Sequence, residues 1–70
     1  MDKVIITTEY IKLEQMMKFA GLAESGADAK NIILGGNVKV NGQQEMKRGK
    51  KLRQGDIVDY EGKKYIIGKN

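Results

Sequence analysis

The segment 25–42 constrains the fold more than any other part of the chain. Ser25 can accept hydrogen bonds from the free backbone donors of a first helical turn, so it predicts a helix start. The glycine pair 35–36 supplies the left-handed residue that ends many helices. Apolar and polar residues then alternate over 38–41, the period of a half-buried strand, and Asn41-Gly42 is a strong hairpin signal. The segment therefore predicts a short helix, a short strand and a tight turn in succession.

A second helical pattern precedes this segment and begins near Tyr10. Its apolar residues recur at intervals of three and four, which places them on one helical face: Tyr10, Leu13, Met16, Met17 and Ala20. Gly21 is expected to end this helix, and the methionine pair is expected to fill the core. Phe19 lies off this face, and we expect it to pack under the second helix rather than to stack on a nucleic-acid base.

Short strand patterns occupy the rest of the chain. Residues 4–8 are β-branched throughout and predict a short edge strand. Further short strands are expected at 43–46, 57–60 and 63–67, and the last two are joined by a Glu61-Gly62 turn. This order predicts an α+β fold in which two short helices pack on a small, mostly antiparallel sheet with an extra N-terminal strand. One domain over residues 1–70 accounts for the whole chain.

Positive charge is concentrated in the second half of the chain. Residues 37–70 hold nine basic residues against four acidic ones, and the formal net charge of the whole chain is +4. The densest run has five cations and no acid: Lys47, Arg48, Lys50, Lys51 and Arg53. Such an asymmetry favours a polyanionic partner. The alternative is a solvated basic loop that only keeps the protein soluble.

Several classes of function lack the residues they need. The chain has no cysteine and no histidine, so the commonest metal ligands and the commonest general base are missing. Ser25 is better explained as a helix cap than as a nucleophile, because no base accompanies it. We therefore expect no enzymatic activity, no metal and no cofactor. No apolar run approaches the ~20 residues of a membrane span, and no signal-peptide pattern begins the chain. We expect a monomer in the cytoplasm.

Weak signals for nucleic-acid binding gather around one expected corner between helix and strand. The helix start offers backbone donors to a phosphate, the strand projects a lysine and an asparagine outward, the first helix exposes a lysine, and the basic run supplies mobile cations. The residues concerned are Lys12, Ser25, Gly26, Lys30, Lys39 and Asn41, together with the cations of the run 47–53. Each has a plain structural explanation as well, such as Asn41 as a turn former. Their joint placement favours a nucleic-acid partner.

The same region resembles a known family. The residues that carry the resemblance are Gly21-Leu22-Ala23, Ser25, Ala29-Lys30, Ile33, Gly36, Val38-Lys39-Val40-Asn41-Gly42, Lys51-Leu52-Arg53 and Gly55-Asp56-Ile57-Val58. Over residues 11–58 they resemble the S4 RNA-binding domain, named after a ribosomal protein of the small subunit. The N-terminal strand and the basic run are similar to a stand-alone bacterial subgroup known as YaaA-like. The resemblance implies two helices in an L against a small sheet, and binding to structured RNA such as ribosomal or transfer RNA.

The resemblance also implies RNA contacts at the matching positions: Lys12, Ser25, Gly26, Lys30, Lys39, Asn41 and Gly42. One departure concerns the second helix. Many members of the family carry an arginine directly after the serine, where this chain has Gly26. That difference weakens the expected phosphate clamp, and the basic run Lys47, Arg48, Lys50, Lys51 and Arg53 is expected to compensate.

The sequence therefore predicts a non-catalytic protein that binds structured RNA, either ribosomal RNA or RNA associated with the ribosome. A-form RNA is recognised mostly through shape, phosphate and 2′-OH contacts, and the chain shows no aromatic platform of the kind that stacks single-stranded bases. Two alternatives stay open. One is a protein-interaction adaptor whose edge strand at 4–8 or 64–67 recruits a partner strand. The other is an RNA-binding module that works with a separate RNA-modifying enzyme.

Overall fold

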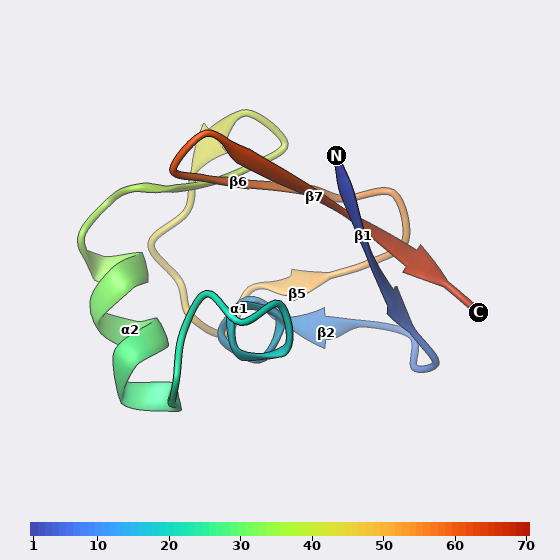
Figure 1. Ribbon diagram of the computed structural model, residues 1–70, viewed down its shortest axis with the longest axis horizontal. Helices are drawn as coiled ribbons and strands as arrows, with labels where there is room; N and C mark the ends of the chain where they lie inside the picture. Colours follow the sequence, from blue (N-terminus) through green and yellow to red (C-terminus); the bar gives the residue numbers. More distant parts are fainter.

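The computed structural model describes all residues from Met1 to Asn70 and consists of two helices and seven short strands (Figure 1). In chain order they are β1 (Asp2–Ile6), β2 (Ile11–Lys12), α1 (Leu13–Phe19), α2 (Gly26–Leu34), β3 (Val38–Val40), β4 (Gln43–Gln44), β5 (Lys51–Leu52), β6 (Ile57–Tyr60) and β7 (Lys63–Lys69). Neither helix has the length and apolar character needed to cross a membrane.

Five strands form the main sheet in the order β1-β7-β6-β3-β4, and β2 pairs with β5 in a separate two-stranded ribbon. The N-terminal strand β1 lies at the edge of this sheet and pairs in parallel with β7, and all other pairs in the sheet are antiparallel. Two turns with positive φ at both central residues close the hairpins: Asn41-Gly42 at 52° and 84°, and Glu61-Gly62 at 51° and 77°. This is the turn geometry that matches the twist of the strands. The predicted α+β fold and both predicted turns are confirmed.

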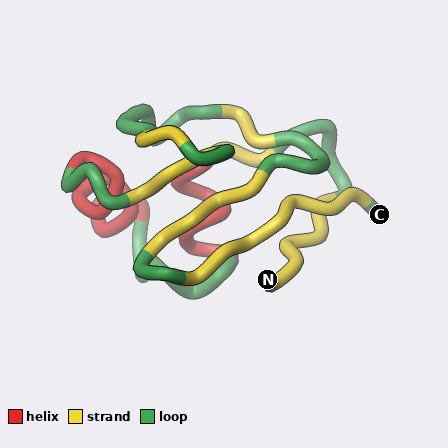
Figure 2. The backbone as a smooth tube through the Cα atoms, turned by 90° about the horizontal axis from the view of Figure 1, so that it is seen from above, coloured by secondary structure: helices red, strands yellow, loops and turns green.

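Both helices lie on one side of the main sheet, together with the β2–β5 ribbon (Figures 1 and 2). Figure 1 shows α1 end-on and α2 from the side, so the two axes cross steeply. The core between these layers contains side chains from all the longer elements: Val4, Ile6, Leu13, Met16, Met17, Ala23, Ala29, Ile33, Val38, Val40, Leu52, Val58, Tyr65 and Ile67. The predicted role of the methionine pair as core filling is therefore confirmed.

The second helix begins and ends as its sequence predicts. The Ser25 hydroxyl accepts a hydrogen bond from the Asp28 backbone N–H at 3.1 Å, which caps the helix. The Asp28 carboxylate accepts from the Glu24 N–H at 2.9 Å, one residue before the position of a standard capping box. At the other end, Gly36 has a φ of +81° and a carbonyl that accepts a 2.7 Å hydrogen bond from the Gln44 side chain.

The first helix differs from its prediction, because it begins at Leu13 instead of Tyr10. Residues 11–12 pair instead with residues 51–52 as the β2–β5 ribbon. The helical spacing of Tyr10 with the later apolar residues was misleading, since tertiary pairing with a segment about forty residues away decides the conformation here. The helical prediction holds from Leu13 onward, and the first strand ends at Ile6, before the two threonines.

Two further predictions are wrong. Phe19 does not pack under the second helix, because its side chain is 66% exposed at the end of α1. Residues 64–67 cannot act as an edge strand, because β7 lies between β1 and β6 and both of its edges are paired. The predicted edge position of the N-terminal strand is confirmed.

Val38 tests the register of β3. Its side chain is fully buried in the core, so Val38→Asp should place a carboxylate there and lower the free energy of unfolding by at least about 3 kcal/mol. Lys39→Gln on the exposed face of the same strand is the control and should stay within about 0.5 kcal/mol. Thermal melts of both variants test this register. An unchanged melting temperature for Val38→Asp would show that the register of β3 is wrong.

Candidate nucleic-acid interface

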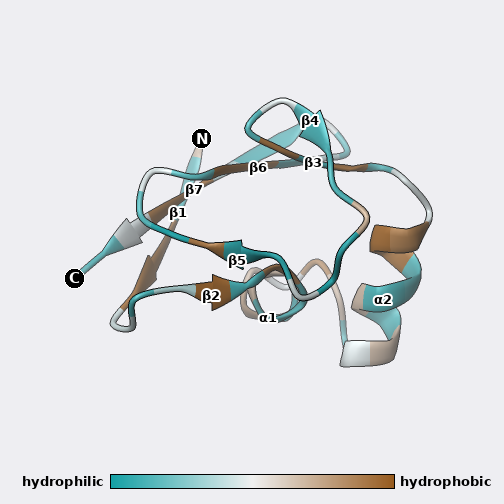
Figure 3. Cartoon of the chain, turned by 180° about the vertical axis from the view of Figure 1, so that it is seen from behind, coloured by the Kyte–Doolittle hydropathy of each residue, from teal (hydrophilic) through white to brown (hydrophobic).

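The β2–β5 ribbon presents one apolar and one charged face. In register, Ile11 pairs with Leu52 and Lys12 pairs with Lys51. Leu52 is fully buried and Ile11 packs against the core. Because side chains alternate across a strand, Lys12 and Lys51 point the other way, and both are exposed. Figure 3 shows this ribbon beside the start of α1, with the hydrophilic chain between β4 and β5 running into it.

The basic run is held by its backbone to the start of the first helix. The Leu13 N–H donates to the Lys50 carbonyl at 2.8 Å, and the Glu14 N–H donates to the Arg48 carbonyl at 3.0 Å. A tight turn closes the run with a 3.1 Å bond from the Lys50 N–H to the Lys47 carbonyl. The backbone of this segment is thus tied to α1, while the exposed side chains that carry the charges extend from it. The two bonds from Leu13 and Glu14 also satisfy backbone N–H donors that a helix start leaves free.

We define the basic ribbon as the cations that β2, β5 and the adjoining residues carry: Lys12, Lys47, Arg48, Lys50, Lys51 and Arg53. All six residues are exposed. The structure contains two ion pairs, Arg48–Glu14 at 3.9 Å and Lys69–Glu9 at 2.6 Å. Only one cation of the basic ribbon is thus within 4 Å of a carboxylate. The other five cations have no carboxylate within 4 Å, so the ribbon is a net positive surface whose backbone is held by hydrogen bonds.

Within the basic ribbon, Lys12 and Lys51 face each other directly. Like charges at directly opposed positions of an antiparallel pair are destabilising, because their Cβ atoms lie only about 5 Å apart. The repulsion between the two lysines therefore lowers the stability of the fold slightly. A phosphate placed between the two ammonium groups would turn this repulsion into two attractions.

Tyr10 belongs to the same face, a position that helical reasoning from the sequence missed. Continuing the ribbon register by one residue places it opposite Arg53. The Lys51 Nζ lies 4.9 Å from the centroid of its ring and the Arg53 Cζ lies 5.6 Å from it, both within the range of a cation–π interaction. The alternation of Tyr10 with Lys12, and of Lys51 with Arg53, is the strand-period signal that could have revealed this face.

Asn41, which the sequence predicts to contact RNA, makes hydrogen bonds within the protein. The Asn41 side chain donates to the Asp56 carboxylate at 3.1 Å and accepts from the Ile57 N–H at 2.9 Å. The second oxygen of Asp56 accepts from the Arg53 N–H at 2.8 Å. Asp56 therefore joins this turn to the end of the basic ribbon and fixes the backbone of Arg53. RNA contact by Asn41 and Gly42 stays a prediction.

The structure does not form the single corner that the sequence suggested. The C-terminal end of α2 leads into β3, whereas Ser25 and Gly26 lie at the N-terminal end of α2. A helix of nine residues separates its two ends by about 13 Å. Glu24 and Asp28 place two carboxylates at that start, which favours the helix dipole but opposes an incoming phosphate. RNA contacts at Ser25 and Gly26 stay predictions, and the start of α2 is a weaker phosphate site than its sequence indicated.

Two more predicted cations lie apart from the basic ribbon. Lys30 is exposed on α2, and Lys39 is exposed on β3. In the sheet, Lys39 pairs in register with Asp59 on one side and with Gln44 on the other, so its charge has a potential partner within the protein. Their contacts with RNA also stay predictions.

Comparison with known proteins places these features in a family context. The family model described as S4 domain matches residues 4–68. A relative from Bacillus subtilis (strain 168), named "Probable ribosome maturation protein RlbA", is 41% identical over 61 residues, which cover 87% of this chain and 86% of the relative. A relative from Escherichia coli (strain K12), whose name describes YbcJ as a candidate RNA-binding protein, is 38% identical over 53 residues, 76% of each chain. Both matches extend over most of the fold described here.

The opposed lysines give a stability prediction. Lys12→Glu should create an attractive pair with Lys51 and place a negative charge at the start of α1, so the free energy of unfolding should rise by about 0.5–1 kcal/mol. Lys63→Glu, on the main sheet, makes the same charge change and should stay within about 0.5 kcal/mol. Denaturant titrations at low salt measure both. A destabilised Lys12→Glu variant would contradict the ribbon register.

Proposed function

Because this chain belongs to the S4 domain family, we propose that it binds structured RNA without catalysing a reaction, and that the basic ribbon is the surface that holds the RNA. The observation that carries the proposal is the directly opposed pair of Lys12 and Lys51, which has no carboxylate within 4 Å. Such a pair is costly in the free protein and favourable beside phosphates. The absence of histidine and cysteine from the sequence is the reason for proposing binding alone.

The rigidity of the basic ribbon favours folded RNA as the ligand. Leu52 anchors β5 in the core, and the carbonyls of Arg48 and Lys50 are bonded to the first turn of α1. Cations carried on a backbone of fixed geometry suit a phosphate backbone whose own spacing is fixed, because proteins recognise A-form RNA mostly by shape. A flexible basic tail would attract any polyanion equally.

We further propose that the RNA is ribosomal and that the protein acts in the cytoplasm as a monomer. The support for a ribosomal target is the name of the Bacillus subtilis relative, which refers to ribosome maturation, and the support for RNA is the name of the Escherichia coli relative. In this proposal Lys30 and Lys39 extend the surface beyond the basic ribbon. Ser25, Gly26, Asn41 and Gly42 mainly shape the backbone, and any contact they make with RNA is secondary.

The first test is the dependence of RNA binding on salt. If about five cations of the basic ribbon meet phosphates, the affinity should fall roughly tenfold for each doubling of the salt concentration, because each contact releases a counterion. Fluorescence anisotropy with a labelled RNA hairpin across a salt series gives the slope. A nearly flat response would rule out binding through the basic ribbon.

The second test uses Lys12→Glu, which we expect to stabilise the fold. Its affinity for the hairpin should fall about tenfold or more, and its salt slope should become shallower by about one, because one phosphate contact is replaced by a repulsion. Lys63→Glu, with the same net charge, should change both quantities little. Since Lys12→Glu is not expected to unfold the protein, a loss of binding points to the surface itself. Equal losses for the two variants would show that only net charge matters.

A further inference from the structure

The ring of Tyr10 is shielded by charged side chains instead of by the core. Tyr10 is half-buried, yet it is not among the residues that pack against the hydrophobic core. The groups near its ring are the ends of Lys51 and Arg53, at 4.9 and 5.6 Å from the centroid. Both of these side chains are exposed, and cation–π contacts at exposed sites are weak. A small movement of two flexible side chains would therefore uncover an aromatic face.

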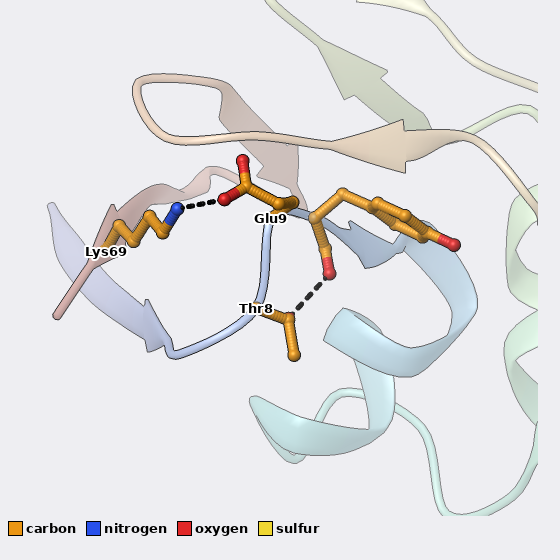
Figure 4. A network of polar contacts seen from close by, with 4 residues as sticks. Thr8, Glu9 and Lys69 are labelled. Atoms are coloured by element: carbon orange, nitrogen blue, oxygen red, sulfur yellow. Dashed lines mark hydrogen bonds and ion pairs between the residues drawn. The ribbon is translucent and has the colours of Figure 1, made fainter.

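The backbone that carries this ring is held in place. The Thr8 hydroxyl donates to the Tyr10 carbonyl at 2.8 Å, and the Lys69 ammonium donates to the Glu9 carboxylate at 2.6 Å (Figure 4). The hydrogen bond and the charge of Lys69, with a smaller effect of Arg53, hold the pKa of Glu9 below its usual range. The ring thus stands on a fixed segment between the main sheet and the ribbon.

The surroundings of the ring match the needs of one nucleotide. A base offers a flat face to an aromatic ring, and its flanking phosphates require cations at either side. Tyr10 supplies the aromatic face, while Lys12, Lys51 and Arg53 supply cations on the same side of the ribbon. The guanidinium of Arg53 can bind a phosphate or stack on a base in its turn. A base can lie on such a ring only where its face is not already stacked within a helix.

We propose that Tyr10 is a stacking platform for one unpaired base, and that the RNA bound by this protein is a helix interrupted by an unpaired nucleotide instead of a continuous duplex. The inference rests on the proposed function, since it specifies the kind of RNA that the basic ribbon holds. It departs from the expectation that the chain has no aromatic platform, and the experiment below tests the two against each other. In a continuous duplex both faces of every base are stacked, so only the cations of the basic ribbon would contribute.

Three RNA hairpins that differ at a single position test the proposal. The first is a continuous duplex stem, the second carries one bulged adenosine, and the third carries an abasic nucleotide at the same bulge. The abasic RNA keeps the phosphates and the flexibility of the bulge but lacks the base. The full-length protein should bind the adenosine bulge about tenfold more tightly than the abasic bulge, within the range that aromatic stacking of one base provides. Anisotropy titrations at one fixed salt concentration measure all three affinities.

Variants of Tyr10 show whether its ring causes the preference for the adenosine bulge over the abasic bulge. Tyr10→Leu should bind the adenosine and abasic bulges equally and should keep its affinity for the continuous stem, because the cations remain. Tyr10→Phe should retain the preference, since it keeps the aromatic face. Phe19→Leu is the matched control: it removes an exposed aromatic ring at another site and should leave the preference unchanged. A thermal melt of each variant confirms that it is folded.

The outcomes separate this inference from the proposed function. Equal affinity of the unaltered protein for the adenosine and abasic bulges would overturn the platform and leave RNA binding intact, whatever the stability of the variants. A Tyr10→Leu variant that loses affinity equally for all three RNAs would show that the ring only positions Lys51 and Arg53, which also overturns the platform. No binding to any of the three RNAs would overturn the proposed function itself.

Discussion

Two backbone hydrogen bonds organise the side of this protein that we propose to bind RNA. The N–H groups of Leu13 and Glu14, which a helix start would otherwise leave free, donate to carbonyls of the basic run at 2.8 and 3.0 Å. Through them the first helix obtains its cap and the basic run obtains a fixed position. Leu52 adds to the same attachment by burying its side chain completely. Without these contacts the cations of the run would lie on a free loop over residues 45–56, between β4 and β6, and their spacing would carry no information about a partner.

The arrangement illustrates how a small domain can accommodate the binding surface proposed here. A chain of this length buries only about 60% of its unfolded surface, so each unfavourable contact is a considerable part of a thin margin. The opposition of Lys12 and Lys51 is one such contact, and it lies where a rigid, uncompensated positive charge is most useful for binding phosphate. If the ribbon binds RNA as proposed, stability and binding make opposite demands on Lys12, as is common at functional sites.

Local signals were sufficient to predict the middle and the end of the chain. The serine cap, the Asn41-Gly42 turn and the Glu61-Gly62 turn each depend on neighbouring residues, and the structure shows all three as expected. The β2–β5 ribbon could not be predicted in this way. Each strand has two residues, and the pairing joins segments about forty residues apart, so neither strand has a period of its own to detect.

The β2–β5 ribbon, which the sequence does not reveal, also accounts for the differences between the predicted and the observed positions of the candidate site residues. Tyr10 fits a helical face by spacing and was therefore expected inside, while the ribbon turns it toward the cations. The basic run was expected to be mobile, because carbonyl hydrogen bonds to a distant helix leave no trace in side-chain composition. The expected corner failed for a related reason: chain order places the end of α2, and not its start, beside β3. The sequence identified all six cations of the basic ribbon but not the surface that unites them.

The most direct test of that surface is a map of backbone amide chemical shifts on addition of an RNA hairpin. If the basic ribbon holds the RNA, the largest changes should fall in residues 10–14 and 48–53, which lie together only because β2 pairs with β5. The β6–β7 turn at Glu61-Gly62 should change little. Changes centred instead on the start of α2 and on β3, with residues 48–53 unaffected, would contradict the assignment of RNA binding to the basic ribbon.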